Sequence, residues 1–273
     1  MRRTLVVLAV LVSTLSAVAQ QPAAPAPPQL TWVRFYNVDR AHTRDFMDVF
    51  NRMNVPVLDK LLTDRQIVSW GLTVPFTMTN QDWTHSLFIT VNNWASGDSL
   101  IRAFDDAERA MTPADMQRDQ ATMAAALKGV HDVVLRHVQQ STSPPAPNAK
   151  PPQYIRVSFY TIKAGRNDDA AAIFREYAAP FYTELATRGV IGPWGFSTQE
   201  VATDPSFTHV VWLFLDSLQR LDQIRDASMA RPATESKTMA LKVQDASESE
   251  KYHSEIMRIV RMGQPPAPPA ARR

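Results

Sequence analysis

Residues 208–215 read THVVWLFL, and residues 84–91 read THSLFITV. Both segments begin with Thr-His and continue with β-branched, aromatic and aliphatic residues, which is typical of a buried strand. The two segments lie 124 positions apart, and the sequences around them also match at that spacing. They therefore predict one equivalent strand in each of two similar halves.

The match between the halves extends without a gap for about fifty residues at this shift of 124 positions. The matched groups are Phe35-Tyr36 with Phe159-Tyr160, Phe50 with Phe174, Pro56 with Pro180, Leu61 with Leu185, Trp70-Gly71 with Trp194-Gly195, and Thr84-His85 with Thr208-His209. After a short deletion the halves realign at a shift of 122, which places His131, Arg136 and Val138 on His253, Arg258 and Val260. Self-similarity of this extent predicts an internal duplication.

Each half has the same predicted order of elements, βαββαβ with one added helix. Alternating segments at 31–38 and 154–162 predict the first strands. Apolar residues at helical spacing predict a helix after Thr43 and another after Asn167, the expected N-cap. Pro56 and Pro180 are expected to kink these helices, because proline lacks a donor and clashes with the preceding turn.

The rest of each half continues the pattern. Second strands are predicted around Trp70 and Trp194, and the Trp-Gly pairs there are expected to be structural, since glycine permits close approach. The remaining expected elements are helices at 98–109 and 217–228, helices opened by Pro113 and Pro232, and last strands at 131–138 and 253–260.

Three segments rich in Pro and Ala separate these units, and such segments favour extended conformations that cannot pack a core. The predicted divisions are a signal peptide at 1–19, a spacer at 20–28, a first repeat at 29–140, a linker at 141–152, a second repeat at 153–262 and a tail at 263–273.

The N-terminus, MRRTLVVLAVLVSTLSAVAQ, has two arginines, an apolar run and the small-x-small pattern Ala17-Val18-Ala19. It predicts a cleaved signal peptide and export to the periplasm or the exterior, with no membrane span remaining after cleavage. Cleavage removes Arg2 and Arg3, which leaves 27 basic residues against 27 acidic ones. Because no basic stripe is present, we expect no nucleic-acid partner. With no Cys, the chain has neither disulfides nor thiolate metal sites.

The element order, together with FYTIKAG at 159–165, AAPFYTELATRG at 178–189, PWGF at 193–196 and the helix that follows THVVWLFL, resembles the ferredoxin-like unit of the dimeric α/β-barrel superfamily, and most of all its NIPSNAP-type members. Members of that superfamily commonly pair two sheets into one barrel. The resemblance therefore implies an α+β fold in which two tandem βαββαβ repeats form one pseudo-dimeric barrel, as a monomer or a weak homo-oligomer. The superfamily includes cofactor-free monooxygenases, haem proteins and proteins with no assigned reaction.

Alternation along the strands predicts which side chains face the barrel lumen, since the helix-covered face should be the more aliphatic. In the third strands, Leu87 and Leu213 should meet the helices. In the first strands, Val33, Phe35, Val157 and Phe159 should meet the helices. An arginine in a last strand is unfavourable beneath a helix, so Arg136 and Arg258 should face the lumen. The expected lumen residues, and hence the candidate ligand-binding residues, are Arg34, Tyr36, Phe88, Arg136, Tyr160, Trp212 and Arg258.

Aromatic walls with a few guanidinium groups would suit a small aromatic or acidic molecule. The alternative is a barrel filled by its own side chains, in which Tyr and Arg are satisfied internally, for example by Glu255, and which serves as a non-catalytic protein-interaction scaffold. A third possibility, which the resemblance allows, is a cofactor-independent monooxygenase of phenolic substrates.

His85 and His209 are the candidate catalytic bases, although their parity places them on the helix side. His131 and His253 stand at strand starts, and His42 and His137 have no counterparts. No pair of histidines has the spacing of a helical metal site, and no acidic cluster completes one. We therefore expect no metal and no other cofactor.

Overall fold

The computed structural model describes residues 28–76, 82–141, 150–202 and 206–263. The predicted signal peptide lies outside these residues, as do most of the predicted spacer, linker and tail.

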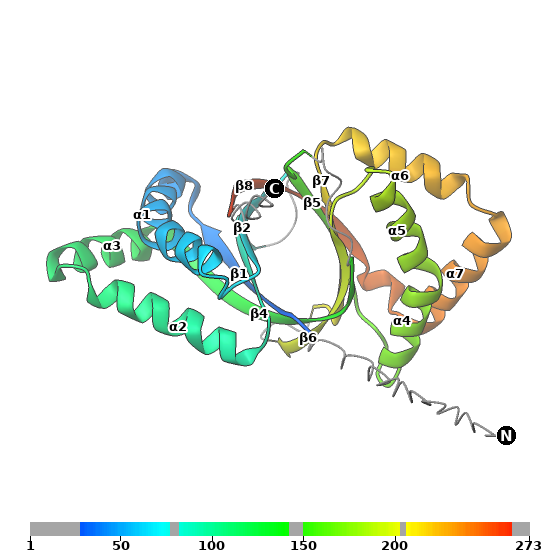
Figure 1. Cartoon of the computed structure of the whole chain (residues 1–273), viewed down its shortest axis with the longest axis horizontal. Coiled ribbons are helices and arrows are strands. Elements are labelled where there is room, and N and C mark those ends of the chain that lie inside the picture. Colours follow the sequence, from blue (N-terminus) through cyan, green and yellow to red (C-terminus); the bar gives the residue numbers. More distant parts are fainter. Residues whose placement is uncertain (1–27, 77–81, 142–149, 203–205, 264–273) are drawn as a thin grey trace, which may run out of the picture.

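Eight antiparallel strands close into one barrel at the centre of the molecule (Figure 1). The first half contributes β1 (Leu30–Val38), β2 (Ser69–Pro75), β3 (His85–Val91) and β4 (Leu127–Gln140), and the second contributes β5 (Tyr154–Tyr160), β6 (Trp194–Ala202), β7 (His209–Leu215) and β8 (His253–Met262). The order around the barrel is β1-β3-β2-β8-β5-β7-β6-β4. This confirms the predicted α+β barrel closed within one chain.

Two strand pairs join the halves and close the barrel. β2 pairs with β8 from Gly71 opposite Met262 to Pro75 opposite Met257. β4 pairs with β6, where Arg136 of β4 donates from Nε to Glu200 of β6 at 2.6 Å. Each pair contains a register shift, which is the signature of a β-bulge and increases the local twist. We call these two pairs the closing seams.

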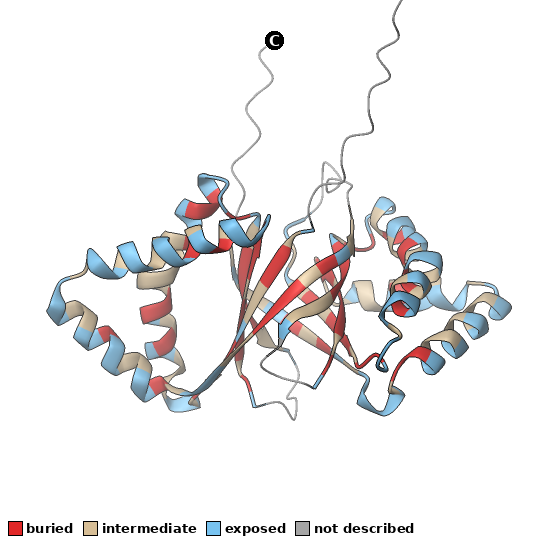
Figure 2. Ribbon diagram, turned by 90° about the horizontal axis from the view of Figure 1, so that it is seen from below, coloured by how far each residue is buried: buried red, intermediate tan, exposed pale blue. Residues whose placement is uncertain are grey.

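The helices lie on the outside of the barrel, one group on each side (Figure 1). The first group comprises α1 (Thr43–Thr63), α2 (Trp94–Arg109) and α3 (Pro113–Ala126), and the second comprises α4 (Asn167–Ile173), α5 (Ala179–Thr187), α6 (Gln219–Met229) and α7 (Ala233–Ala246). Figure 2 shows buried residues along the strands and along parts of the helices, while the outer surfaces of the helices are exposed. The apolar spacing predicted for α1 is confirmed, since Phe46, Phe50 and Leu61 are buried.

The expected proline kinks are realised differently in the two halves. Pro56 lies inside α1, which continues as one helix to Thr63. In the second half a π-helical turn at Phe174–Ala178 separates α4 from α5 and ends two residues before Pro180. Proline cannot donate the helical hydrogen bond, and a π turn is one way of accommodating that loss. Asn167 is the first residue of α4, and its N-cap is Arg166 rather than Asn167.

Three apolar clusters hold the fold together. One lies between the first sheet and its helices and contains Phe46 and Trp70. A second lies in the equivalent place of the other half and contains Phe174 and Trp194. The third lies inside the barrel and draws residues from both halves, for example Phe35 and Phe159. The barrel interior is therefore a shared core of the two halves.

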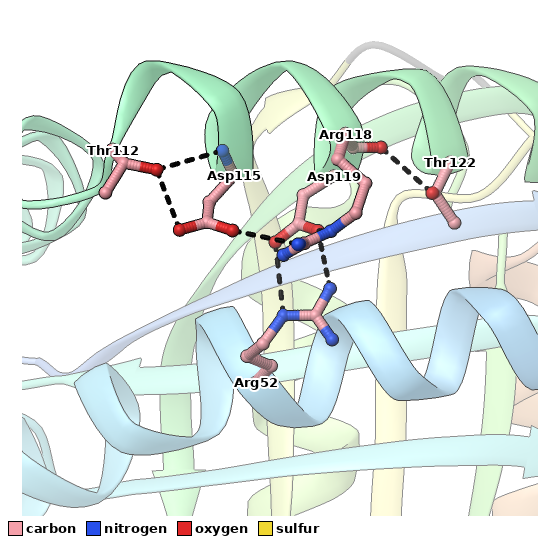
Figure 3. A network of polar contacts seen from close by, with 6 residues as sticks. All are labelled: Arg52, Thr112, Asp115, Arg118, Asp119 and Thr122. Carbon is pink, nitrogen blue, oxygen red and sulfur yellow. Dashed lines mark hydrogen bonds and ion pairs between the residues drawn. The ribbon is translucent and has the colours of Figure 1, made fainter.

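A chain of ion pairs holds α3 against α1 (Figure 3). Thr112 caps α3 by accepting the amide of Asp115 at 3.1 Å, and Asp115 pairs with Arg118 at 2.8 Å. Asp119, whose side chain is fully buried, accepts from Arg118 at 3.2 Å and from Nη2 of Arg52 on α1 at 2.5 Å. The Arg52 guanidinium lowers the pKa of Asp119 below the ordinary aspartate value of 3.8. Asp119 therefore stabilises the fold as a carboxylate.

Replacing Asp119 with Asn should lower the free energy of unfolding by about 1 to 2 kcal/mol, because Arg52 and Arg118, which lie near the surface, lose their charged acceptor. Since the pKa of Asp119 is lowered by folding, the difference from wild type should be present at neutral pH and vanish as the pH falls below the ordinary value of 3.8. Urea unfolding at several pH values measures it. Asp222→Asn, at a side chain 65% exposed, is the matched control and should change stability little.

Candidate functional site

A cavity of about 100 Å³ lies in the barrel lumen and is bounded by both halves. Its walls come from β1, β3 and β4 of the first half and from β5, β7 and β8 of the second, with Ser69 of β2 and Phe207 before β7. The six aromatic side chains of the wall are Phe35, Phe88, Phe159, Phe207, Trp212 and Phe214. Mostly apolar walls with a few polar groups are typical of a small-molecule site.

Two glycines allow the largest rings to lie in the lumen. A Cβ atom on Gly195 would lie 2.4 Å from Cζ2 of Trp212, and one on Gly71 would lie 2.6 Å from Cζ of Phe88. Each ring therefore packs directly over the backbone of the neighbouring strand. The structure thus gives the Trp-Gly pairs the close-approach role that was expected of them.

Polar groups gather at the end of the lumen where β1 starts and β4 ends. Nε2 of His137 is 2.7 Å from Oγ1 of Thr31, which is 2.9 Å from Oγ1 of Thr90. Nδ1 of His137 contacts the side chain of Gln140, and the His137 ring lies 5.5 Å from that of Trp212. Burial lowers the pKa of His137, so the imidazole is neutral near neutral pH and can donate or accept a hydrogen bond.

Among the described residues, one carboxyl group lies toward the opposite end of the lumen. Glu255 of β8 is 5% exposed, and its Oε2 atom has no hydrogen-bond partner. It stands opposite Val157 of β5 and two residues before Met257, and both of these line the cavity. Burial raises the pKa of Glu255 to about 7. Beyond it, His253 stacks on Phe159 at 4.6 Å, and His131 stacks on Phe35 at 4.7 Å.

The third strands have the predicted parity. Phe88 and Trp212 line the cavity, together with Ser86, Thr90, Val210 and Phe214. The alternate residues Leu87 and Leu213 lie in the clusters beneath the helices. The alternation argument therefore placed two of the candidate ligand-binding residues correctly.

The predicted parity of the first strands is wrong. Val33, Phe35, Val157 and Phe159 line the cavity instead of meeting the helices. Arg34, Tyr36 and Tyr160 consequently lie on the outer face: Tyr36 packs on Phe46 of α1 at 5.2 Å, and Arg34 donates to Asp132 at 2.7 Å. Tyr160 packs against the helix cluster of the second half. Both faces of β1 carry buried aromatic residues, Phe35 on one and Tyr36 on the other, so aromatic character does not distinguish the faces.

The predicted lumen position of the two matched arginines is also wrong. Arg136 lies on the outer face in its ion pair with Glu200, and Arg258 is exposed. On the same strands Leu135 and Met257 line the cavity. The outer face of the last strands is only partly covered by helices, so an arginine is accommodated there by water and by Glu200. His137, for which the sequence offers no counterpart, shares the parity of Leu135 and also lines the cavity.

His85 and His209 lie on the helix side, as their parity predicted. Nδ1 of each ring is 2.9 Å from the hydroxyl of the preceding threonine. His85 packs on Phe46 at 5.0 Å, and His209 packs on Phe196 at 5.3 Å. Burial lowers both pKa values to about 4. Neither lines the lumen cavity, so neither is placed to act on a molecule bound there.

Within the part of the chain that the structure describes, no group of three or more His, Asp or Glu residues could hold a metal ion. Over the same residues, no helix has the length and hydropathy needed to cross a bilayer.

No family model matches the sequence, and no curated protein matches it. A solved structure from Fusobacterium nucleatum subsp. nucleatum ATCC 25586, named "Putative monooxygenase", is similar over 88% of this chain and 96% of its own, with 9% identity and a TM-score of 0.57. Another, from Lactobacillus acidophilus NCFM and also named "putative monooxygenase", is similar over 87% of this chain and 96% of its own, with 10% identity and a TM-score of 0.58. At these identities the similarity shows the fold alone, an α+β barrel closed by eight antiparallel strands.

The buried carboxyl makes a prediction about stability. Folding raises the pKa of Glu255 to about 7, so this group favours the folded state at low pH, and that contribution is lost as the pH rises through about 7. Glu255→Gln cannot ionise, so its melting temperature relative to wild type should rise by a few degrees between about pH 5 and pH 8.5, each 1 kcal/mol being worth about 2–4 °C. Thermal unfolding followed by circular dichroism measures this. Glu250→Gln, at an exposed site, should show no such trend.

Proposed function

We propose that the barrel lumen binds one small, mostly apolar aromatic molecule whose polar group meets His137 and Thr31. The observation that supports this most directly is the cavity itself, which has six aromatic side chains in its wall and a hydrogen-bonded His137 at one end. Apolar walls supply most of the binding free energy, and the few polar groups set the orientation of the ligand.

The cavity volume limits the size of the ligand. A cavity of about 150 Å³ accepts benzene in a protein core, whereas the lumen cavity measures about 100 Å³. A one-ring molecule therefore requires a rotamer change of a wall side chain such as Phe88 or Phe214. Fused-ring molecules would require the barrel to open, and the proposal is limited to single rings.

An acidic ligand is expected only if arginines line the lumen. Arg34, Arg136 and Arg258 lie on the outer face, and none of the described residues that line the cavity is Arg or Lys. The six aromatic side chains of the wall support an aromatic ligand, whereas no Arg or Lys of the described wall supports an acidic one.

Binding of benzyl alcohol to the purified protein tests the proposal. We expect saturable quenching of tryptophan fluorescence, because Trp212 lines the cavity. His137→Ala should weaken binding about five- to twenty-fold through loss of one hydrogen bond. Gly195→Ala should abolish it, since the new Cβ forces the Trp212 ring toward the cavity. Arg258→Gln, on the outer face, should bind as wild type does. Absence of binding to wild type by both fluorescence and calorimetry would contradict the proposal.

A second candidate function is cofactor-independent oxygenation of a phenol bound in the same cavity. Two observations favour it: the fold is shared with structures named as monooxygenases, and a neutral histidine lies at the cavity. Nε2 of His137 would take the phenolic proton, either through the Thr31 hydroxyl that contacts it or in place of that hydroxyl. One atom of O₂ would enter the ring as a carbonyl oxygen. The other would leave as water with the phenolic proton and the hydrogen of the attacked carbon, so the substrate supplies all the electrons.

Oxygen uptake with phenol or hydroquinone, without added flavin or metal, tests this second candidate. His137→Ala should lower the enzymatic rate at least about a hundred-fold, the usual contribution of a general base. His85→Ala and His209→Ala should retain the rate if they fold, because these rings lie on the helix side. A rate in His137→Ala equal to wild type would exclude His137, and uptake no faster than with heat-denatured protein would exclude the activity.

Three further proposals rest on the sequence. The matched residues of the two halves support an origin by duplication and a relationship to NIPSNAP-type proteins, and the N-terminal pattern supports export to the periplasm or exterior. Monomeric behaviour is supported by barrel closure within one chain. A scaffold with a solid lumen has less support, because a cavity remains among the packed side chains.

A further inference from the structure

Among the described residues, the lumen side of the barrel carries a carboxyl group without a neighbouring Arg or Lys on the same side. The described residues of the cavity wall include no Arg or Lys. Glu255 is the carboxyl group whose strand position directs it to this side, between Val157 across the strand pair and Met257 along the strand. Any net charge that the barrel interior carries at neutral or alkaline pH from these residues is therefore negative.

Glu255 has an unused hydrogen-bonding atom in a buried place. The residue is 5% exposed, and Oε2 has no partner. Native proteins pair nearly all buried polar atoms, since an unpaired one costs about 1–3 kcal/mol, and more when charged. An unpaired buried atom on a residue whose neighbours Val157 and Met257 line the cavity therefore calls for an explanation, and a bound ligand would provide one.

The barrel does not need a carboxyl group at this position. The sequence match at a shift of 122 places Val133 of the first half on Glu255. Val133 is 1% exposed, lies in the same interior cluster and lines the cavity. Valine thus fills the equivalent place in β4, which lies between β1 and β6 as β8 lies between β5 and β2. This indicates that glutamate at 255 serves something other than closure of the barrel.

We propose that the lumen selects a one-ring ligand that carries a protonated amine, with the Glu255 carboxylate as the partner of the ammonium group. The inference rests on the proposed binding of a one-ring molecule in the lumen and specifies its ligand class, with the charged group of the ligand directed toward Glu255 instead of toward His137 and Thr31. An ammonium group would give Oε2 its missing donor and offset the cost of a buried anion. The aromatic wall adds to this, because rings attract cations across their faces.

The site has a defined set of titratable neighbours. On β8 itself, His253 shares the face of Glu255. On β5, which pairs with β8, Tyr154, Arg156 and Tyr160 have the parity of the outer face. β2, the other partner, has no titratable residue from Ser69 to Pro75. His131 and His137 are the remaining histidines on the lumen side. Because several titratable groups lie nearby, the pH midpoint of ligand binding does not by itself identify the group responsible. A pH dependence is therefore assigned to Glu255 by replacing that residue.

Three ligands of nearly equal shape test the proposal: benzylamine, benzyl alcohol and benzoate. Wild-type protein should bind benzylamine at least about ten-fold more tightly than benzyl alcohol at about pH 8, and benzoate most weakly. The affinity for benzylamine should fall up to ten-fold per pH unit below about pH 7, where the carboxyl takes up a proton. The ammonium stays protonated over this range, since alkylamines titrate near ~10.

Two variants isolate the carboxylate. Glu255→Gln keeps the shape, and Glu255→Val copies the residue at Val133. Both should lose at least about ten-fold in benzylamine affinity, lose its pH dependence, and keep the affinity for benzyl alcohol within about three-fold. Isothermal titration calorimetry measures all three ligands, and circular dichroism checks folding. Glu250→Gln is the matched control at an exposed site.

The outcomes separate this inference from the function on which it rests. If benzyl alcohol binds wild type, but benzylamine binds no more tightly or binds Glu255→Gln equally well, the amine proposal is overturned and the lumen-binding function stands. If none of the three compounds binds wild-type protein, both fail. If benzoate binds most tightly, the ligand class is acidic and the inference is overturned.

Discussion

The two closing seams are the interaction on which the rest of the structure depends. A four-stranded sheet has two edges with unpaired backbone groups, and such edges invite pairing with another chain. Here β2 pairs with β8 and β4 pairs with β6, so each half satisfies the edges of the other. The linkage between the halves within one chain makes this pairing intramolecular, and no edge remains in the closed order. Both seams contain register shifts, and a bulge at such a place increases the local twist of the strands.

Closure creates an interior that neither half possesses alone. Residues more than a hundred positions apart, such as Phe35 and Phe159, share the interior cluster. The interior is not symmetric, even though the order of elements is the same in both halves. At the shifts that align the sequences, His137 matches Ile259, Thr31 matches Ile155, and Glu255 matches Val133. Within the described part of the chain the lumen therefore offers one polar end and one carboxyl group, and we expect one oriented ligand rather than two equivalent ones.

The barrel and the third strands could be predicted from the sequence, while the faces of the first and last strands could not. The repeated pattern around THVVWLFL established the element order, and Leu213 and Trp212 differ enough in character to separate two faces. In β1, Phe35 and Tyr36 are both buried, one in the lumen and one beneath α1, so composition carries no signal about the face. Arg136 was misplaced because its partner, Glu200, lies on a strand of the other half, 64 positions away. A prediction made one strand at a time cannot include that partner.

The buried glutamate and the buried aspartate show how environment decides what a carboxyl group contributes. Asp119 is fully buried, but two guanidinium groups reach it, so folding lowers its pKa and its charge stabilises the helix pair. Glu255 is buried without such a partner, so folding raises its pKa and its charge opposes the fold. The first arrangement needs nothing more from outside the protein. The second arrangement lacks a donor, which the proposed ammonium ligand would supply from the lumen. Because such a ligand would offset the cost of burying the Glu255 charge, its binding would stabilise the barrel.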